Sequence, residues 1–165
     1  MDRPFCFVTL FAAILLFAAA PVALAQSEPA ALLEKHFEAI NRGDAAGSLA
    51  MFADDAVFDV PLPGGLCAAA PCVGKATIQK EMESRVADKG HYTILKLYVS
   101  GNVTTVRFEF RSDTVKQAGV ERITTWSISE MKGDKIAYVR GAILDRTDPQ
   151  TARFIEWQRT QPPAR

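Results

Sequence analysis

The hydrophobic pattern of the chain changes its period at Gly90. Before this residue, apolar side chains recur every three or four positions, which is the spacing of one helix face. After it, apolar and polar side chains alternate for about fifty residues, from His91 to Leu144, as in strands with one buried face. Helices followed by a run of strands predict an α+β fold in which one face of the sheet packs on the helices.

Turn residues divide the second half of the chain into four strands. Ser100-Gly101-Asn102 and Lys132-Gly133-Asp134 are typical of tight hairpins, and residues 116–119 are typical of a longer turn. Strands joined in this way form an antiparallel meander. The predicted strands cover residues 91–99, 103–112, 120–131 and 135–144.

The chain outside this meander predicts four helices and one strand. Leu33, Phe37 and Ile40 share one face of the first helix, and Gly43 provides a stop after it. The predicted elements are a first helix from Pro29 to Ile40, a short second helix after Asp44 that includes Met51 and Phe52, a strand over 56–60, a third helix over 75–87, and a short C-terminal helix over 151–157.

The N-terminus is typical of a secretory signal peptide. Asp2 and Arg3 precede an apolar run that breaks at Pro21, and Ala23 and Ala25 occupy the small-residue positions that signal peptidase recognises. The alternative, an uncleaved anchor, needs roughly 20 apolar residues, more than this run contains. We expect residues 1–25 to be a cleaved signal peptide and residues 26–165 to be a single domain that works in the periplasm or as a secreted protein.

The charge balance argues against nucleic acid as a partner. Lysine plus arginine and aspartate plus glutamate number 19 each, and no segment concentrates basic residues. After Gln26 no apolar run is long enough to span a bilayer, so no membrane contact is expected once the signal peptide is removed.

Cys67 and Cys72 lie in a loop marked by proline and glycine. In an oxidising compartment such a close pair predicts a disulfide that closes a small local loop. A redox or metal pair would need a C-x-x-C spacing or further Cys and His ligands, and the sequence has neither nearby. We therefore expect a structural bridge, with no metal and no cofactor.

Several segments resemble one known family. The string Asn41-Arg42-Gly43-Asp44, the segment from Phe52 to Phe58, the helix start at Val73-Gly74-Lys75 and the last hairpin at residues 133–136 are similar to the SnoaL-like branch of the nuclear-transport-factor-2-like superfamily. The resemblance covers residues 29–158. It implies three N-terminal helices packed on a strongly curved, cone-shaped antiparallel sheet with a pocket at its wide end, and a homodimer through the outer sheet face.

The same resemblance does not settle the reaction, because that superfamily includes ketosteroid isomerases, polyketide cyclases, epoxide hydrolases and proteins without chemistry. At the positions of the isomerase tyrosine, general base and second oxyanion donor, this chain has His36, Val60 and Trp126, or Ser127 if the last hairpin differs by one residue. Asp59 is adjacent to the position of the base. Valine cannot accept a proton, so ordinary isomerase chemistry is not expected.

An epoxide hydrolase would need an aspartate, arginine, aspartate set inside the pocket. The nearest candidates, Arg107, Glu109 and Arg111, alternate along one strand with Val106, Phe108 and Phe110. Because a curved sheet normally turns its apolar side inward, we expect these charged residues to face solvent or a dimer partner.

The expected pocket lining is apolar and suits a small hydrophobic molecule. Its predicted polar group is His36, supported by Asp59 or Thr124, which would act as a hydrogen-bond donor or a general base, with His36 and Asp59 as the catalytic residues. The alternative is that His36 is an ordinary histidine on the helix surface or in the core. The lining predicted from strand alternation is Leu33, Phe37, Phe52, Phe58, Val60, Leu97, Phe108, Trp126, Ile128, Val139 and Ile143.

Three functions remain open from the sequence. The favoured one is an exported domain that binds a small apolar molecule in the cone. The others are an enzyme of the same family, such as an isomerase, cyclase or hydrolase with a non-standard site, and a homodimeric interaction domain without a ligand.

Overall fold

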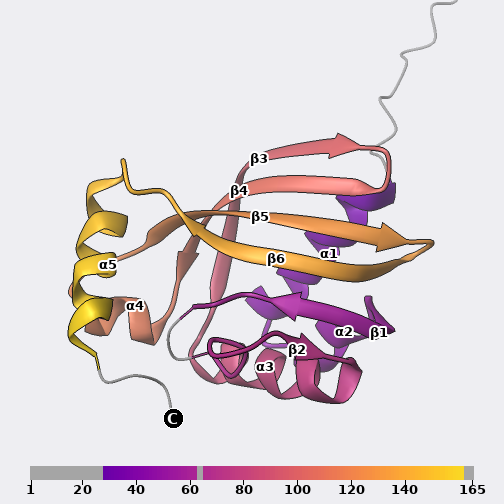
Figure 1. Ribbon diagram of the computed structural model, residues 1–165, viewed down its shortest axis with the longest axis horizontal. Helices are drawn as coiled ribbons and strands as arrows, with labels where there is room; N and C mark the ends of the chain where they lie inside the picture. Colours follow the sequence, from indigo (N-terminus) through magenta and orange to yellow (C-terminus); the bar gives the residue numbers. More distant parts are fainter. Residues whose placement is uncertain (1–27, 63–64, 162–165) are drawn as a thin grey trace, which may run out of the picture.

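The computed structural model describes residues 28–62 and 65–161 (Figure 1). The predicted signal peptide therefore lies outside the described residues. One six-stranded sheet organises the domain, and its strands lie in the order β2 (Cys72–Val73), β1 (Phe52–Asp59), β6 (Lys135–Leu144), β5 (Ile123–Lys132), β4 (Val103–Arg111) and β3 (His91–Ser100). Three helices lie along one side of it, namely α1 (Glu28–Asn41), α2 (Ala45–Leu49) and α3 (Lys75–Ala87) (Figure 1). Two further helices, α4 (Asp113–Gln117) and α5 (Pro149–Thr160), lie together at one end. The predicted α+β fold is confirmed.

The first two helices form where the sequence pattern predicts them. In α1 (Glu28–Asn41) Leu33, Phe37 and Ile40 are buried against the sheet. The helix stops at Gly43, whose φ of +77° is a conformation that glycine adopts without strain. Asp44 then caps α2 (Ala45–Leu49) by accepting a hydrogen bond from the Gly47 amide.

Strand β1 (Phe52–Asp59) begins four residues earlier than expected, so the placement of Phe52 in the second helix was wrong. The reason is tertiary. β1 pairs in parallel with β6 (Lys135–Leu144), and the Ile136 amide donates to the Met51 carbonyl. A short β2 (Cys72–Val73) pairs with β1 on its other edge, which the sequence did not predict.

The predicted antiparallel meander is confirmed. Strands β3 (His91–Ser100), β4 (Val103–Arg111), β5 (Ile123–Lys132) and β6 pair in chain order. A short helix, α4 (Asp113–Gln117), interrupts the connection between β4 and β5, because the Ser112 hydroxyl caps it at the Val115 amide. β5 begins at Ile123 and not at Val120, and the amides of Glu121 and Arg122 before it donate to the side-chain oxygen of Gln150.

The hydrophobic core lies between the helices and the inner face of the sheet. α3 (Lys75–Ala87) contributes Ile78 and Met82, both fully buried, and the strands contribute a cluster of aromatic rings. The stacked pair Phe37 and Tyr92, with centroids 4.4 Å apart, joins α1 to β3.

The C-terminal helix α5 (Pro149–Thr160) packs against β5. Its Thr151 hydroxyl accepts a hydrogen bond from the Thr124 amide, and Phe154 is buried. The C-terminal helix predicted over residues 151–157 is confirmed, and it begins two residues earlier and ends three residues later than expected. Within the described residues, no helix has the length and apolar character needed to cross a membrane.

Candidate functional site

The space enclosed by the curved sheet is small. Its cavity has a volume of about 30 Å³, enough for a water molecule but not for an organic ligand. The polar groups in its wall come from His36, Arg85, Tyr92, Ser127 and Ser129. Six residues of the predicted lining also border it, namely Leu33, Phe37, Phe58, Val60, Phe108 and Val139.

Five residues of the predicted lining lie elsewhere. Phe52 is buried in the core and Leu97 packs against it, but neither borders the cavity. The inward orientation predicted for the others, Trp126, Ile128 and Ile143, was wrong, because alternation along β5 turns Ser127 and Ser129 inward instead.

The outer face of the sheet accounts for this error. Trp126 stacks on Tyr98 with ring centroids 6.4 Å apart, and the guanidinium of Arg107 lies 6.0 Å from its ring. Ile143 pairs with Trp126 across the strands and is 48% exposed. The rule that apolar residues face inward fails here because the outer face carries an apolar patch of its own, which consists of Leu95, Tyr98, Trp126, Ile128 and Ile143.

The predicted charge ladder lies on the same outer face. Arg107 forms an ion pair with Asp145 at 2.8 Å, and Glu109 pairs with both Arg111 and Arg122 at 3.0 Å. These ion pairs connect β4 to neighbouring segments on the outside of the cone. Their charged groups therefore cannot act as an acid or a base in the enclosed cavity, and they cannot bind a ligand there.

His36 is buried on α1 beside the cavity. Its Nδ1 lies 2.8 Å from the Ser48 hydroxyl oxygen, and its ring meets Phe52 edge to face. Burial, followed by the positive charge of Arg85, lowers the pKa of His36 to about 3. The imidazole is therefore neutral at physiological pH, and since Ser48 is fully buried, the pair does not present a nucleophile to a substrate.

The structure does not bring Asp59 to His36. Phe58 and Val60 both line the cavity, so Asp59 between them points to the opposite face of the sheet. There its carboxylate accepts a hydrogen bond from the Tyr138 hydroxyl at 3.3 Å. A proton cannot pass directly between His36 and Asp59 in this arrangement.

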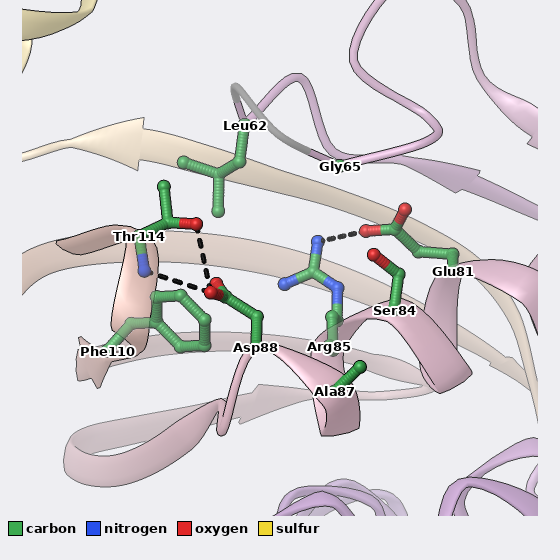
Figure 2. Close-up of a pocket in the computed structure, with 9 residues that line it drawn as sticks. All are labelled: Leu62, Gly65, Glu81, Ser84, Arg85, Ala87, Asp88, Phe110 and Thr114. Atoms are coloured by element: carbon green, nitrogen blue, oxygen red, sulfur yellow. Dashed lines mark hydrogen bonds and ion pairs between the residues drawn. The ribbon is translucent and has the colours of Figure 1, made fainter. Parts of the chain in front are cut away.

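A larger pocket, here called the mouth pocket, is lined by the side chains that Figure 2 shows as sticks. Its volume is about 320 Å³, which is at the lower end of the range for small-molecule sites. It lies between the loop after β1, the C-terminal half of α3 and the segment from β4 to α4. The lining consists of Leu62, Gly65, Glu81, Ser84, Arg85, Ala87, Asp88, Phe110 and Thr114.

A buried ion pair forms one wall of the mouth pocket. Nη2 of Arg85 lies 2.7 Å from Oε1 of Glu81, one turn away on α3, and both side chains are buried. Nη1 of Arg85 donates to the Tyr92 hydroxyl at 2.7 Å, and the guanidinium lies 5.2 Å from the Phe58 ring centroid. Burial opposes the charge of Arg85, but Tyr92 and Glu81 outweigh it and raise the pKa of Arg85. Arg85 also borders the enclosed cavity, so it separates the two spaces.

The predicted disulfide between Cys67 and Cys72 is present, with 5.2 Å between the Cα atoms. It supports the loop that covers Glu81. The amides of Leu66 and Cys67 donate to Oε2 of Glu81 at 2.7 and 3.3 Å. The disulfide loop and the ion pair therefore form one connected wall.

Glu81, Arg85 and Asp88 were not among the site residues predicted from the sequence. A signal for the first two was present, because they share the helix side of Ile78 and Met82, the apolar positions of α3. Two opposite charges four residues apart on a buried helix face indicate a paired internal site. No group of three or more Cys, His, Asp and Glu side chains in the described part of the chain is arranged to hold a metal ion.

Comparisons with known proteins agree with the fold. A family model described as a SnoaL-like domain matches residues 33–139. The search of curated proteins found no match. Among solved structures, an NTF2-like protein of unknown function from Cytophaga hutchinsonii is 14% identical, with a TM-score of 0.58 and coverage of 75% of this chain and 96% of that chain.

Two further solved structures have names that refer to enzymes. A candidate polyketide cyclase from Sinorhizobium meliloti is 19% identical, with a TM-score of 0.56 and coverage of 68% of this chain and 94% of that chain. A candidate ketosteroid isomerase from Kribbella flavida is 18% identical, with a TM-score of 0.55 and coverage of 69% and 76%. At these identities the likeness shows the fold alone.

Proposed function

Since the chain belongs to the SnoaL-like domain family, whose model matches residues 33–139, we propose that it is an exported domain that binds a small molecule in the mouth pocket. One observation carries this proposal. The mouth pocket has about 320 Å³ of space and a buried ion pair in its wall, whereas the enclosed cavity has about 30 Å³. The proposed binding site is therefore the mouth pocket and not the smaller cavity that six residues of the predicted apolar lining border.

The lining favours a ligand with an apolar body and a polar end. Leu62 and Phe110 are buried apolar residues on two sides of the mouth pocket, and they offer contact to a hydrophobic group. Ser84 and Asp88 also line the pocket, are partly exposed and offer hydrogen-bonding atoms to a ligand. The proposed ligand is therefore hydrophobic, as the sequence suggested, and in addition carries a polar head group.

An enzyme with His36 and Asp59 as a catalytic pair has no support from the geometry of these two residues. His36 is hydrogen-bonded to Ser48, and Asp59 is on the opposite face of β1 with Tyr138. The activities named for the two similar structures describe those proteins and are not evidence of catalysis by this chain. We therefore place binding ahead of catalysis in the proposal.

Export is supported by the N-terminal sequence and by the disulfide. A disulfide such as that between Cys67 and Cys72 forms and persists in an oxidising compartment. N-terminal sequencing and the intact mass of the protein recovered from its host test this part. We expect a chain that begins at Gln26 and contains no free thiol.

A homodimer is part of the proposal as well. The apolar patch on the outer sheet face contains Tyr98, Leu95 and Ile143, which are 52%, 41% and 48% exposed. Side chains of this kind gathered on one face are typical of a surface that packs against a partner.

Native mass spectrometry of the protein purified from its own host tests ligand binding. We expect the wild type to retain a small molecule and the Ser84→Trp variant, in which the indole fills the mouth pocket, to lose it. Lys80→Trp is the matched control, because residue 80 is exposed on the same helix and does not line this pocket. An empty wild-type protein that also takes up nothing from a panel of hydrophobic metabolites would contradict the proposal.

A further inference from the structure

Asp88 carries the charge in the mouth-pocket lining that no other lining residue balances. The guanidinium of Arg85 is matched by the carboxylate of Glu81 at 2.7 Å, and both of these side chains are buried. Asp88, by contrast, is partly exposed and forms no ion pair with a residue of the described chain. The lining therefore has one unbalanced negative charge, and this charge lies where a ligand can reach it.

The protein uses only one oxygen of the Asp88 carboxylate. Oδ1 accepts two hydrogen bonds, from the amide and the hydroxyl of Thr114, both at 2.9 Å, and Figure 2 draws both of them. These bonds fix the orientation of the carboxylate where α3 and α4 meet. Oδ2 makes no hydrogen bond to a described residue and is not among the buried polar atoms that lack a partner, so it keeps accessible surface.

The end of α3 adds to the negative potential around Asp88. This residue is the C-cap of α3, and the C-terminal end of a helix carries a partial negative charge that favours a cation. The last turn has a basic residue of its own, Arg85, but Glu81 already balances its charge. The ammonium of Lys89 pairs with Asp113 at 2.7 Å, and Lys89 does not line the mouth pocket. No cation of the described chain is thus paired with Asp88.

From these observations we propose that the mouth pocket binds a small amphipathic cation, namely a hydrophobic amine that is protonated at pH 7. The ammonium donates to Oδ2 of Asp88 and balances its charge, and the apolar body contacts Leu62 and Phe110. A carboxylate at the same place would be repelled by Asp88, and a hydroxyl would gain the hydrogen bond without the attraction between charges. This inference rests on the proposed function and names its ligand class.

Three probes with one carbon skeleton separate the possible head groups. They are 4-phenylbutylamine, 4-phenylbutan-1-ol and 4-phenylbutanoate, which are positive, neutral and negative at pH 7. Binding to the mature, oxidised protein is followed by NMR titration of the backbone amides, including that of Thr114, which donates to Asp88. We expect the amine to bind about tenfold more tightly than the alcohol, and the carboxylate to bind more weakly than both.

Salt provides a second test on the wild-type protein alone. Dissolved ions screen the attraction between partly exposed charges, so added salt should weaken the binding of the amine relative to that of the alcohol. The ranking of the probes and this salt dependence decide the inference even if a variant is unstable.

Asp88→Asn removes the charge while it keeps the contact with Thr114. The amide oxygen of asparagine can accept the two hydrogen bonds of Oδ1, and a nitrogen that donates replaces Oδ2. We expect the preference for the amine over the alcohol to disappear. Glu83→Gln is the matched control, because it removes one carboxylate from an exposed position of the same helix that does not line the mouth pocket. It should leave the preference unchanged.

Ser84→Trp tests where the amine binds. Ser84 lines the mouth pocket one helical turn before Asp88, so an indole at this position fills the pocket and leaves the carboxylate of Asp88 in place. Binding of the amine should be lost. An amine that binds this variant as tightly as the wild type is held on the surface, and that result would contradict the proposed site.

Two other results would overturn the inference, namely an amine that binds no more tightly than the alcohol, and a preference for the amine that persists in Asp88→Asn. If none of the probes binds although the wild type retains a host molecule that Ser84→Trp loses, the head-group inference fails and the proposed function stands. If none of the probes binds and no host molecule is retained, both fail.

Discussion

Nδ1 of His36 and the hydroxyl oxygen of Ser48 lie 2.8 Å apart and join the first two helices inside the protein. The same hydroxyl lies 3.3 Å from the sulfur of Met82 on α3, so one serine connects three helices. Both His36 and Ser48 are buried. The pair holds the helices in place only while the imidazole is uncharged, since a buried cation beside Arg85 is unfavourable.

The free energy of unfolding should therefore fall on acidification. The pKa of His36 is about 3 in the folded protein and near its ordinary value of 6.5 after unfolding, so the unfolded chain binds the proton first. The stabilisation is fully present above pH 6.5 and is lost towards pH 3, with a slope that approaches about 1.4 kcal/mol per pH unit. Urea unfolding between pH 7 and pH 5 measures it, before most carboxylates titrate.

The chain provides its own control, because it has two histidines and His91 is exposed. His91→Gln should keep the pH dependence, whereas His36→Gln should flatten it even if the protein is less stable overall. A slope that survives in His36→Gln would assign the effect to other groups.

The ion pair of Glu81 and Arg85 should show strong coupling in a double-mutant cycle. Glu81→Gln leaves a buried guanidinium without its counter-charge, and we expect a loss of about 3 to 5 kcal/mol. The double variant Glu81→Gln with Arg85→Met removes both charges and should lose clearly less than the sum of the single changes. Urea unfolding at pH 7 measures all four proteins, and simple additivity would mean that the two groups do not interact.

Gly141 should tolerate a side chain only if Val60 becomes smaller. A Cβ at position 141 would lie 2.9 Å from Cγ2 of Val60, a contact that the branched side chain cannot relieve by rotation alone. Gly141→Ala should cost about 1 to 3 kcal/mol in the wild-type background. In a Val60→Ala background the same change should cost nothing, and an equal loss in both backgrounds, measured by urea unfolding, would show that the contact is not the cause.

The disulfide should contribute modestly to stability. Because it closes a short loop with a sequence separation of 5, replacing Cys67 and Cys72 by alanine should cost about 2 kcal/mol. A reducing agent should lower the free energy of unfolding of the wild type by a similar amount. It should leave the free energy of unfolding of the alanine variant unchanged. A loss several times larger would mean that the bridge supports more of the fold than the wall over Glu81.

The outer sheet face should control the oligomeric state. Ile143→Asp places a charge in the exposed apolar patch beside Trp126, and we expect it to convert a dimer into a monomer in light-scattering measurements. Leu66→Asp is the control, since residue 66 is also exposed but belongs to the loop beside the mouth pocket. A wild-type protein that is monomeric at all concentrations would exclude the proposed dimer.

The local sequence determined most of the elements, their order and the disulfide, but not the short elements β2 and α4. Leu33, Phe37 and Ile40 define the buried side of α1 by their spacing alone, and the glycines at 101 and 133 mark hairpins because their positive φ values suit tight turns. These signals act between residues that are close in the chain, so they can be read without the fold.

The tertiary structure decided which faces and which charges are internal. Whether Trp126 or Ser127 points inward depends on the partners that each face of β5 receives, and the outer face offered Tyr98 and Arg107. Likewise, Glu81 and Arg85 can be buried only because Tyr92 and the amide of Leu66 satisfy them from other segments. Burial of a polar group depends on contacts that distant parts of the chain supply, and no local pattern contains that information.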